Sequence, residues 1–483
     1  MTNFIRNIRA GTTPEVLLMA FLGTTVLSIW LGIALESYML WATPLAVLLV
    51  FIAIVDFRKL FFLLLFLIPL STELYLPGGF ATDFPTEPLM VGLLLIGGAW
   101  VLQRASRLQT DYIRHPISIL VLLHLAWILM TTLGSDLWMV SLKFLLAKLW
   151  YVGVFYFLAL HLLRREADMR LFFWLVFSSL LLTVVLTLFR HSAYNFSFQD
   201  VFRVLHPYQR NHVNYAASIS LFIPFVWLGI RRYAKKKYLR NLLWLALMIL
   251  LLGVYLSYTR AAYIALLIAV GSYFLIRMGW LRYLIPAALL VAVLALGYLM
   301  RANRFMELAP NYDRTISHTD FDNLLEATYK LEDISTMERV YRWVAGGYLA
   351  LDHPWMGVGP GNFVNFYRSY TLDAFRTYVS NNKEDSGIHS YYLMTLVEQG
   401  LPGLLIFLLL AAGSLIWGEQ VYHQTRDPER KLRVMAALLC LIIIDSFLII
   451  NDLIETDKVG PFFFMSLAVI VAVDVANRVS LDS

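Results

Sequence analysis

Residues 387–403 read GIHSYYLMTLVEQGLPG and join a long polar segment to an apolar one. His389 stands where the polar segment ends, and Glu398 lies inside the apolar run that follows. The Gly-Leu-Pro-Gly sequence at 400–403 interrupts the helix that this run predicts. Non-helical backbone inside a membrane is tolerated only where it packs in protein or lines a water-filled cavity, and ionisable residues there are functional candidates.

The composition is that of a polytopic membrane protein. Of the 483 residues, 59% are hydrophobic and 15% are charged, whereas soluble domains have about 45–50% apolar and about 25% charged residues. The net charge of +6 comes from Lys and Arg in short loops, which indicates topology and not nucleic-acid binding. A single cysteine, Cys440, excludes an intrachain disulfide. Residues 1–13 are polar and basic, so we expect no cleavable signal.

Long apolar runs predict the membrane-spanning helices. Runs of about 17–25 residues can cross a bilayer, and the sequence holds about fourteen. They lie near 15–35, 38–55, 59–75, 88–103, 117–134, 138–162, 168–189, 213–230, 240–257, 260–277, 281–300, 389–417, 432–451 and 460–477. The predicted fold class is an all-α polytopic membrane protein with about 12–14 transmembrane helices. It divides into membrane helices at 1–300, one large outer loop at 301–388 between the eleventh and twelfth spans, and C-terminal membrane helices at 389–483.

Charges in the short loops predict the orientation. Alternate loops are basic, around 58–59, 104–114, 164–170, 231–237, 277–282 and 426–433, and the remaining short loops are acidic. Because basic loops stay in the cytoplasm, both termini are predicted to be cytoplasmic. The loop 190–212, the turn 258–260 and the loop 301–388 then all face the outside.

The loop 301–388 is predicted to be an ordered unit. It has about 88 residues, and loops of that length are usually functional or disordered. Residues 337–351 carry apolar and aromatic side chains at helical spacing, with Ser335 or Thr336 as candidate N-caps. A glycine-rich turn at 357–362 and an aromatic helix at 363–370 follow.

His389 and Glu398 are the candidate catalytic residues of the interrupted helix. His389 is either a base that takes a proton from an acceptor hydroxyl or a helix-capping histidine of the core, and its place at a membrane entry favours the base. Glu398 is either a second acidic group of the site or a structural carboxylate that holds the interrupted helix, and the structural role is favoured.

Two arginines lie at predicted outer turns. Arg260 occupies a hairpin between two spans that is too short to be an idle linker. A guanidinium stays charged and binds phosphate oxygens in a fork, so Arg260 is a candidate diphosphate ligand, although an arginine there could instead snorkel to lipid headgroups. Arg210 precedes the predicted span 213–230, on the same side of the membrane as Arg260, and is a second candidate anion ligand.

Three further cations are candidate site residues: Arg339 as a catalytic residue, and Arg342 and Lys148 as diphosphate ligands. Arg339 and Arg342 lie three positions apart and share one face of the predicted loop helix, so one can reach the site while the other is solvated. Lys148 lies deep in a predicted span, where it needs a partner such as a phosphate or the carboxylate of Asp445.

These residues suggest a metal-free chemistry without a cofactor. The sequence has no acidic motif on an early outer loop, no HExxH, no Walker loop and no GxSxG. Arginines suit a diphosphate leaving group, and aromatic residues of the loop suit sugar rings; they include Trp343, Tyr348, Trp355, Phe363, Phe366 and Tyr367. An enzyme outside the membrane has no ATP, so its donor must carry its own activation, as a lipid-diphosphate-linked glycan does.

The chain resembles the O-antigen ligase and O-antigen polymerase superfamily, whose members are bacterial integral-membrane glycosyltransferases of the GT-C type. The resemblance rests on SYTRAA at 257–262, on the stretch from Glu338-Arg339 to DHPWMGVGPGNF at 352–363, and on His389-Ser390 with Glu398-x-Gly400-x-x-Gly403. A weaker likeness covers 211–216. The order and spacing of these motifs around one large outer loop is specific.

The resemblance implies a role for each matching residue. His389 resembles the essential loop histidine, which activates or orients the acceptor hydroxyl. Arg210 and Arg260 resemble the arginines that hold undecaprenyl diphosphate, and Arg339 matches the loop arginine before the tryptophan. The family implies a metal-independent, inverting transfer at the periplasmic face of the bacterial inner membrane.

Several functions stay open. A ligase would move a finished glycan to lipid A-core, and a polymerase would move it to a second lipid-linked repeat unit; the motifs lean slightly to the ligase. A protein O-oligosaccharyltransferase is a third option. A transporter of the same lipid would predict inverted repeats and a path of charges across the membrane, neither of which the sequence shows.

Overall fold

The computed structural model describes residues 14–36, 40–41, 43–76, 80–103, 110–309, 333–377, 380–382 and 386–482. Within these residues, nine helices are long and apolar enough to cross a membrane. They are α6 (Pro116–Leu133), α7 (Trp138–Val152) continued to Leu162, α9 (Glu166–Ser192), α11 (His212–Arg232), α12 (Lys237–Tyr255), α13 (Arg260–Met278), α14 (Leu281–Met300), α18 (Tyr391–Gln424) and α20 (Gly460–Asp482). The chain is thus a helical multi-pass membrane protein, while the count of about fourteen spans and the place of the large loop stay predictions.

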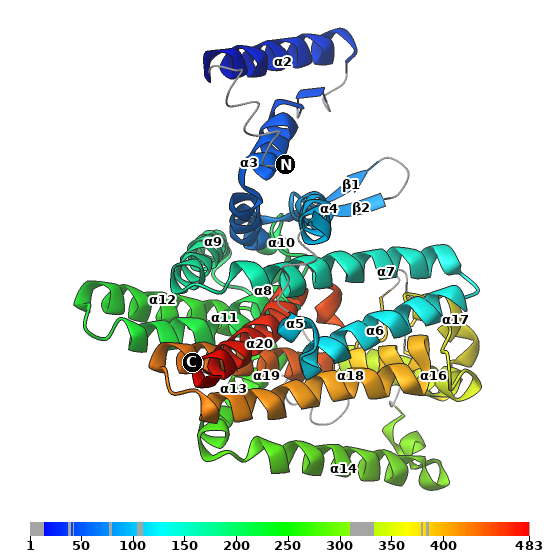
Figure 1. Cartoon of the computed structure of the whole chain (residues 1–483). Helices are drawn as coiled ribbons and strands as arrows, with labels where there is room; N and C mark the ends of the chain where they lie inside the picture. Colours follow the sequence, from blue (N-terminus) through cyan, green and yellow to red (C-terminus); the bar gives the residue numbers. More distant parts are fainter. Residues whose placement is uncertain are drawn as a thin grey trace.

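The C-terminal helices form the centre of the bundle. α19 (Pro428–Leu448) packs against α11, α13, α18 and α20 (Figure 1). Every residue at 434–444 and at 457–471 is buried, as expected for helices that are apolar on all sides. α14 lies on the outside, and Leu281 is its only buried residue.

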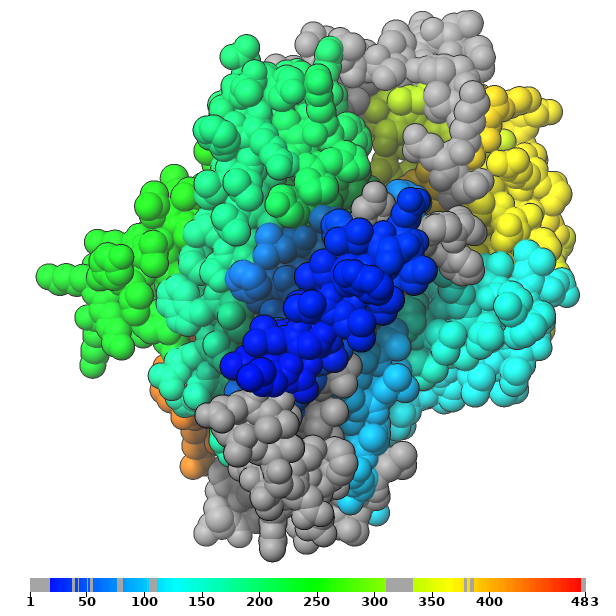
Figure 2. Space-filling model, turned by 90° about the horizontal axis from the view of Figure 1, so that it is seen from above, coloured from blue at the N-terminus to red at the C-terminus, as the bar shows by residue number. Residues whose placement is uncertain are grey.

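The N-terminal helices lie against one side of this bundle. α2 (Pro14–Ala34) stands beyond α3 (Thr43–Leu67) in Figure 1. Figure 2, seen from that side, shows α2 crossing the face of the molecule beside the cyan surface of α6 and α7. α4 (Thr86–Gln103) follows, and it packs on α3 and α7.

The predicted third span, 59–75, is too long. The helix ends at Leu67, and a 3-10 turn follows over Ile68–Leu70, where Pro69 lacks the N–H that an α-helix would need. β1 (Thr72–Leu76) and β2 (Phe80–Phe84) then form an antiparallel hairpin that the sequence did not predict. The break predicted between 55 and 59 is confirmed, because Asp56 has non-helical angles of φ −157° and ψ 87°.

The interruption predicted in α18 is also confirmed. Gly400 has φ 71°, and a Cβ there would lie 2.2 Å from the Trp355 carbonyl oxygen, so only glycine fits. The backbone groups freed by the break are satisfied by the preceding loop: Gly359 N–H donates to the Glu398 carbonyl (3.0 Å), and Leu401 N–H donates to the Pro354 carbonyl (2.7 Å). The non-helical backbone is therefore packed in protein.

The predicted loop helix is α16 (Ile334–Asp352), which packs against α18. Its N-cap is Asp333, whose Oδ2 accepts from Thr336 N–H at 3.1 Å, and not Ser335 or Thr336 as the sequence suggested. A carboxylate at this position also offsets the positive end of the helix dipole. Residues 310–332, 378–379 and 383–385 of the predicted loop lie outside the described residues.

Candidate active site

His389 lies between α16 and α18, two residues before the first residue of α18. The Trp343 indole N–H donates to the Ile388 carbonyl at 3.0 Å, and an Arg342 Nη1–H donates to the Gly387 carbonyl at 3.4 Å, which fixes the backbone before the histidine. Ser390 then caps α18, since its Oγ accepts from Leu393 N–H at 3.5 Å. His389 itself has φ 56°, a left-handed conformation that is uncommon for residues other than glycine. The backbone is therefore held in a strained conformation at the centre of the site.

The imidazole of His389 is kept neutral. Burial, together with the positive charges of Arg339 and Arg342, lowers its pKa to about 3. In the part of the chain that the structure describes, neither ring nitrogen has a hydrogen-bond partner. A neutral imidazole with a free lone pair can accept a proton from a hydroxyl group.

Two guanidinium groups, those of Arg339 and Arg342, act electrostatically on this histidine, and that of Arg260 neighbours Arg339. Arg260 begins α13, and Arg339 and Arg342 come from one face of α16. Burial lowers the pKa of Arg339 to about 10, and the neighbouring charge of Arg260 contributes in the same direction. The structure thus brings His389 together with Arg339 and Arg342, and it places Arg260 beside Arg339, from segments that are far apart in sequence.

Two of these arginines retain donors that no described residue uses. Arg339 donates from Nη1 to the Ser335 carbonyl (3.2 Å) and hydroxyl (2.8 Å), and Arg342 pairs through Nη2 with Glu338 (3.3 Å). The Nε–H groups of both are buried without a partner among the described residues. Because a buried, unpaired donor is costly, these groups favour an anionic ligand.

Arg260 is held by a carboxylate. Its Nη2 lies 3.1 Å from Asp333 Oδ2, the same oxygen that caps α16. Asp333 thus joins the start of α13 to the start of α16 and orients the guanidinium. This contact leaves open how Arg260 takes part in anion binding, which stays a prediction.

Asp452 is a site residue that sequence reasoning missed. It lies between α19 and the 3-10 helix η8 (Leu453–Glu455), and a Cβ on Gly387 would be 2.6 Å from its Oδ2. Burial raises the pKa of Asp452, and the charges of Arg339 and Arg342 oppose this increase. In the sequence, Asp452 was recognisable only as part of an acidic outer loop. No local pattern indicated that it would lie against Gly387.

His212 is a second residue that sequence reasoning did not assign. It opens α11, and its backbone carbonyl accepts from the Thr259 hydroxyl at 3.1 Å, which ties α11 to the start of α13. The charges of Arg339 and Arg260 act on its ring, and its Nδ1 is buried without a partner in the described part of the chain. The polar segment 208–216, which was predicted to start this helix, borders the site through His212.

Arg210 is directed to the β-hairpin. Its Nη2 lies 3.0 Å from Glu73 and 3.4 Å from Asp83, which are cross-strand neighbours in β1 and β2. These contacts anchor the hairpin over the start of α11. They favour a structural role over the predicted contact with diphosphate.

Lys148 is fully buried, and its partner differs from the one suggested by the sequence. Its Nζ lies 2.5 Å from Glu455 Oε1 and 3.3 Å from the Tyr391 hydroxyl, whereas Asp445 was the carboxylate proposed. A buried amine needs such a pair. Because Tyr391 follows Ser390 directly, the pair supports the helix start behind His389.

Glu398 holds the glycine-rich turn. Its Oε2 accepts from Gly361 N–H at 2.8 Å and its Oε1 from Phe363 N–H at 3.0 Å. Both oxygens of this buried carboxylate are therefore engaged with the backbone. The geometry favours the structural role over the catalytic one.

Replacing Glu398 with glutamine is therefore expected to destabilise the protein. The amide NH₂ would face a backbone N–H, at a cost of about 1–3 kcal/mol. Thermal unfolding in detergent should shift to lower temperature, while the activity per folded molecule stays near that of the wild type. A folded Glu398→Gln protein that has lost transfer activity would assign Glu398 to catalysis instead.

The comparisons with known proteins concern the segment that contains most of the candidate site residues. A search of curated proteins found no match. A family model described as O-Antigen ligase matches residues 245–408. The matched segment contains Arg260, Arg339, Arg342, His389 and Glu398, and it excludes Arg210 and Lys148. The match confirms, over this segment of a multi-pass membrane protein, the resemblance to the O-antigen ligase and polymerase superfamily.

Proposed function

We propose that the site transfers a glycan from undecaprenyl diphosphate to an acceptor hydroxyl, with lipid A-core as the acceptor. The observation that carries this proposal is a neutral His389 beside Arg339 and Arg342, whose buried Nε–H donors have no partner among the described residues. The family match supports lipid-linked glycans as the class of donor. On this proposal the site faces the periplasm, and both termini lie on the cytoplasmic side of the bacterial inner membrane.

The bond changes follow from these residues. The acceptor oxygen attacks the anomeric carbon, and the bond from that carbon to the diphosphate oxygen breaks. The leaving electron pair stays on the diphosphate, where Arg339 and Arg342 stabilise the added charge. The hydroxyl proton passes to His389. Attack opposite the leaving group inverts the anomeric configuration.

Asp452 is proposed to balance the positive charges of Arg339 and Arg342. Before the donor binds, its carboxylate partly offsets Arg339 and Arg342. A bound diphosphate adds negative charge near both arginines and so raises the pKa of His389 towards its usual value. The imidazole would then become a stronger base only in the donor complex.

The choice of acceptor needs a direct experiment. Purified protein receives one lipid-linked glycan together with lipid A-core, with a second lipid-linked repeat unit, or with a peptide containing serine and threonine. A ligase yields product only with lipid A-core. Product only from two lipid-linked units would establish the alternative, a polymerase, and glycopeptide would establish a protein glycosyltransferase. Absence of transfer in all three mixtures, from folded protein that binds the donor, would contradict a glycosyltransferase.

We propose that catalysis requires no divalent metal, because guanidinium groups supply the positive charge at the leaving diphosphate. Treatment with EDTA is expected to leave the rate of transfer unchanged. The measurement is the initial rate before and after chelation, with and without added Mg²⁺. Loss of activity that Mg²⁺ restores would overturn this part of the proposal.

A further inference from the structure

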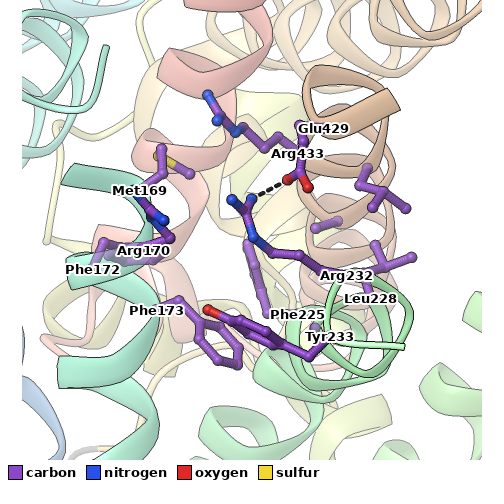
Figure 3. A pocket seen from close by; sticks show the side chains of 13 residues that line it. Met169, Arg170, Phe172, Phe173, Phe225, Leu228, Arg232, Tyr233, Glu429 and Arg433 are labelled. Carbon is purple, nitrogen blue, oxygen red and sulfur yellow. Dashed lines mark hydrogen bonds and ion pairs between the residues drawn. The ribbon is translucent and has the colours of Figure 1, made fainter. Parts of the chain in front are cut away.

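A hollow lies at the other end of the bundle from His389. Its walls come from the start of α9, the end of α11 and the start of α19, and it encloses about 580 Å³, including space open to the outside (Figure 3). His212 and Arg232 stand at opposite ends of α11, and a helix of that length spans about 30 Å. The hollow is therefore remote from the candidate active site, on the side that the basic loops predict to be cytoplasmic.

The polar part of this hollow is cationic. Arg170, Arg232 and Arg433 line it together with a single carboxylate, Glu429. Arg232 is paired with Glu429, as the dashed line in Figure 3 shows. Two arginines of the lining, Arg170 and Arg433, then remain without a carboxylate in that lining.

Arg433 has donors available for a ligand. Its side chain is only 12% exposed, yet neither its Nε nor its Nη2 has a hydrogen-bond partner in the described part of the chain. The carboxylate that pairs with its Nη2 is Glu166, at 3.7 Å, beyond hydrogen-bond distance and 52% exposed. A guanidinium buried in this way calls for an anion that can accept from it.

The rest of the lining is apolar. Figure 3 shows Phe172, Phe173, Phe225 and Leu228 facing the hollow below the arginines. Phe172 and Leu228 are already buried by the protein, whereas Phe173 and Phe225 are partly exposed, and an inorganic anion on the cationic rim would leave these two uncovered. A ligand that uses both parts combines an anionic head with a hydrocarbon chain.

We infer that this hollow is a binding site for an anionic phospholipid of the cytoplasmic leaflet. Its phosphodiester would accept from Arg433 and Arg170, and an acyl chain would cover the partly exposed Phe173 and Phe225. Anionic lipids are the amphiphiles present at this depth, and positive side chains near the cytoplasmic surface attract them. The bound lipid would join α9 to α19 across the end of α11.

The binding experiment separates the contributions of charge and chain. Full-length protein, delipidated in detergent, is titrated with phosphatidylglycerol, phosphatidylcholine or glycerol 3-phosphate, and bound lipid is counted by native mass spectrometry. Phosphatidylglycerol is expected to bind at least about tenfold more tightly than phosphatidylcholine. Equal binding of the two lipids would overturn the site, and displacement of phosphatidylglycerol by equimolar glycerol 3-phosphate would show a site for soluble anions instead.

Three variants test the assignment to this hollow. Arg433→Gln is expected to weaken phosphatidylglycerol binding about tenfold, because charge-assisted hydrogen bonds are lost. Arg170→Gln, an exposed change that keeps the fold, should weaken it about threefold. Arg426→Gln removes the same charge from the exposed loop between α18 and α19 and should leave binding unchanged. If both Arg433→Gln and Arg170→Gln bind phosphatidylglycerol with wild-type affinity, the proposal is contradicted. If Arg433→Gln does not fold, wild-type affinity of Arg170→Gln is enough to contradict it.

Discussion

Replacing His389 with asparagine is expected to lower glycan transfer at least about 100-fold, the usual contribution of a general base. Asparagine is the informative replacement because it tolerates the left-handed conformation that His389 adopts, at φ 56°, while it lacks a basic nitrogen. The measurement is the rate of product formation by purified, folded enzyme with saturating donor. Donor affinity should change little, because the diphosphate contacts come from the arginines.

The matched comparison is His389→Ala, which loses the base and also strains the backbone. It should be at least as inactive as the asparagine variant and less stable, since alanine at positive φ is disfavoured. Near-normal transfer by the asparagine variant would exclude His389 as the base. It would leave the diphosphate site untouched, so the two parts of the proposal are distinguishable.

The same histidine predicts a simple dependence on pH. Its pKa of about 3 lies below the value near 6.5 that it has in an unfolded chain, so the free enzyme keeps His389 neutral down to acidic pH. The dependence of kcat/KM on pH should therefore show no inflection from this residue between about pH 5 and 8. Stability behaves differently: because the unfolded histidine binds a proton below about pH 6.5, folding is penalised progressively as pH falls from there towards 3.

Replacing Arg339 with glutamine is expected to reduce kcat/KM about 100-fold or more, comparable to the loss of a donor that stabilises developing negative charge. Arg339 is the guanidinium of the site with no carboxylate at hydrogen-bond distance in the described residues, and its buried Nε–H is free for a phosphate oxygen. Arg339→Lys keeps a charge but loses the fork, so partial recovery is expected. The measurement is kcat/KM for the lipid-linked donor.

Arg376→Gln is the matched control, since Arg376 is exposed on the same loop region. It should leave kcat/KM unchanged. Equal losses in the Arg339 and Arg376 variants would indicate long-range attraction of the anionic donor in place of a specific contact. That outcome would exclude Arg339 as a diphosphate ligand without excluding His389 as the base.

The sequence was most informative where one local segment decides the outcome. Long apolar runs require membrane helices, and the Gly-Leu-Pro-Gly sequence at 400–403 interrupts a helix whatever packs against it. The motif around Trp343 likewise predicted a helix that presents Arg339 and Arg342 on one face. These features follow from the spacing and type of residues within a few turns of chain.

Pairing between distant residues was decided only by the tertiary structure. Nothing near Lys148 in the sequence distinguishes Glu455 from Asp445, and nothing near Arg210 indicates a hairpin at Glu73 and Asp83. The sequence by itself determined that this chain crosses a membrane repeatedly and presents a histidine and several arginines at loop ends. The packing of α13, α16 and α18 decided which of those arginines meet His389, because a charge in a low-dielectric interior takes whichever partner the fold brings within a few ångströms.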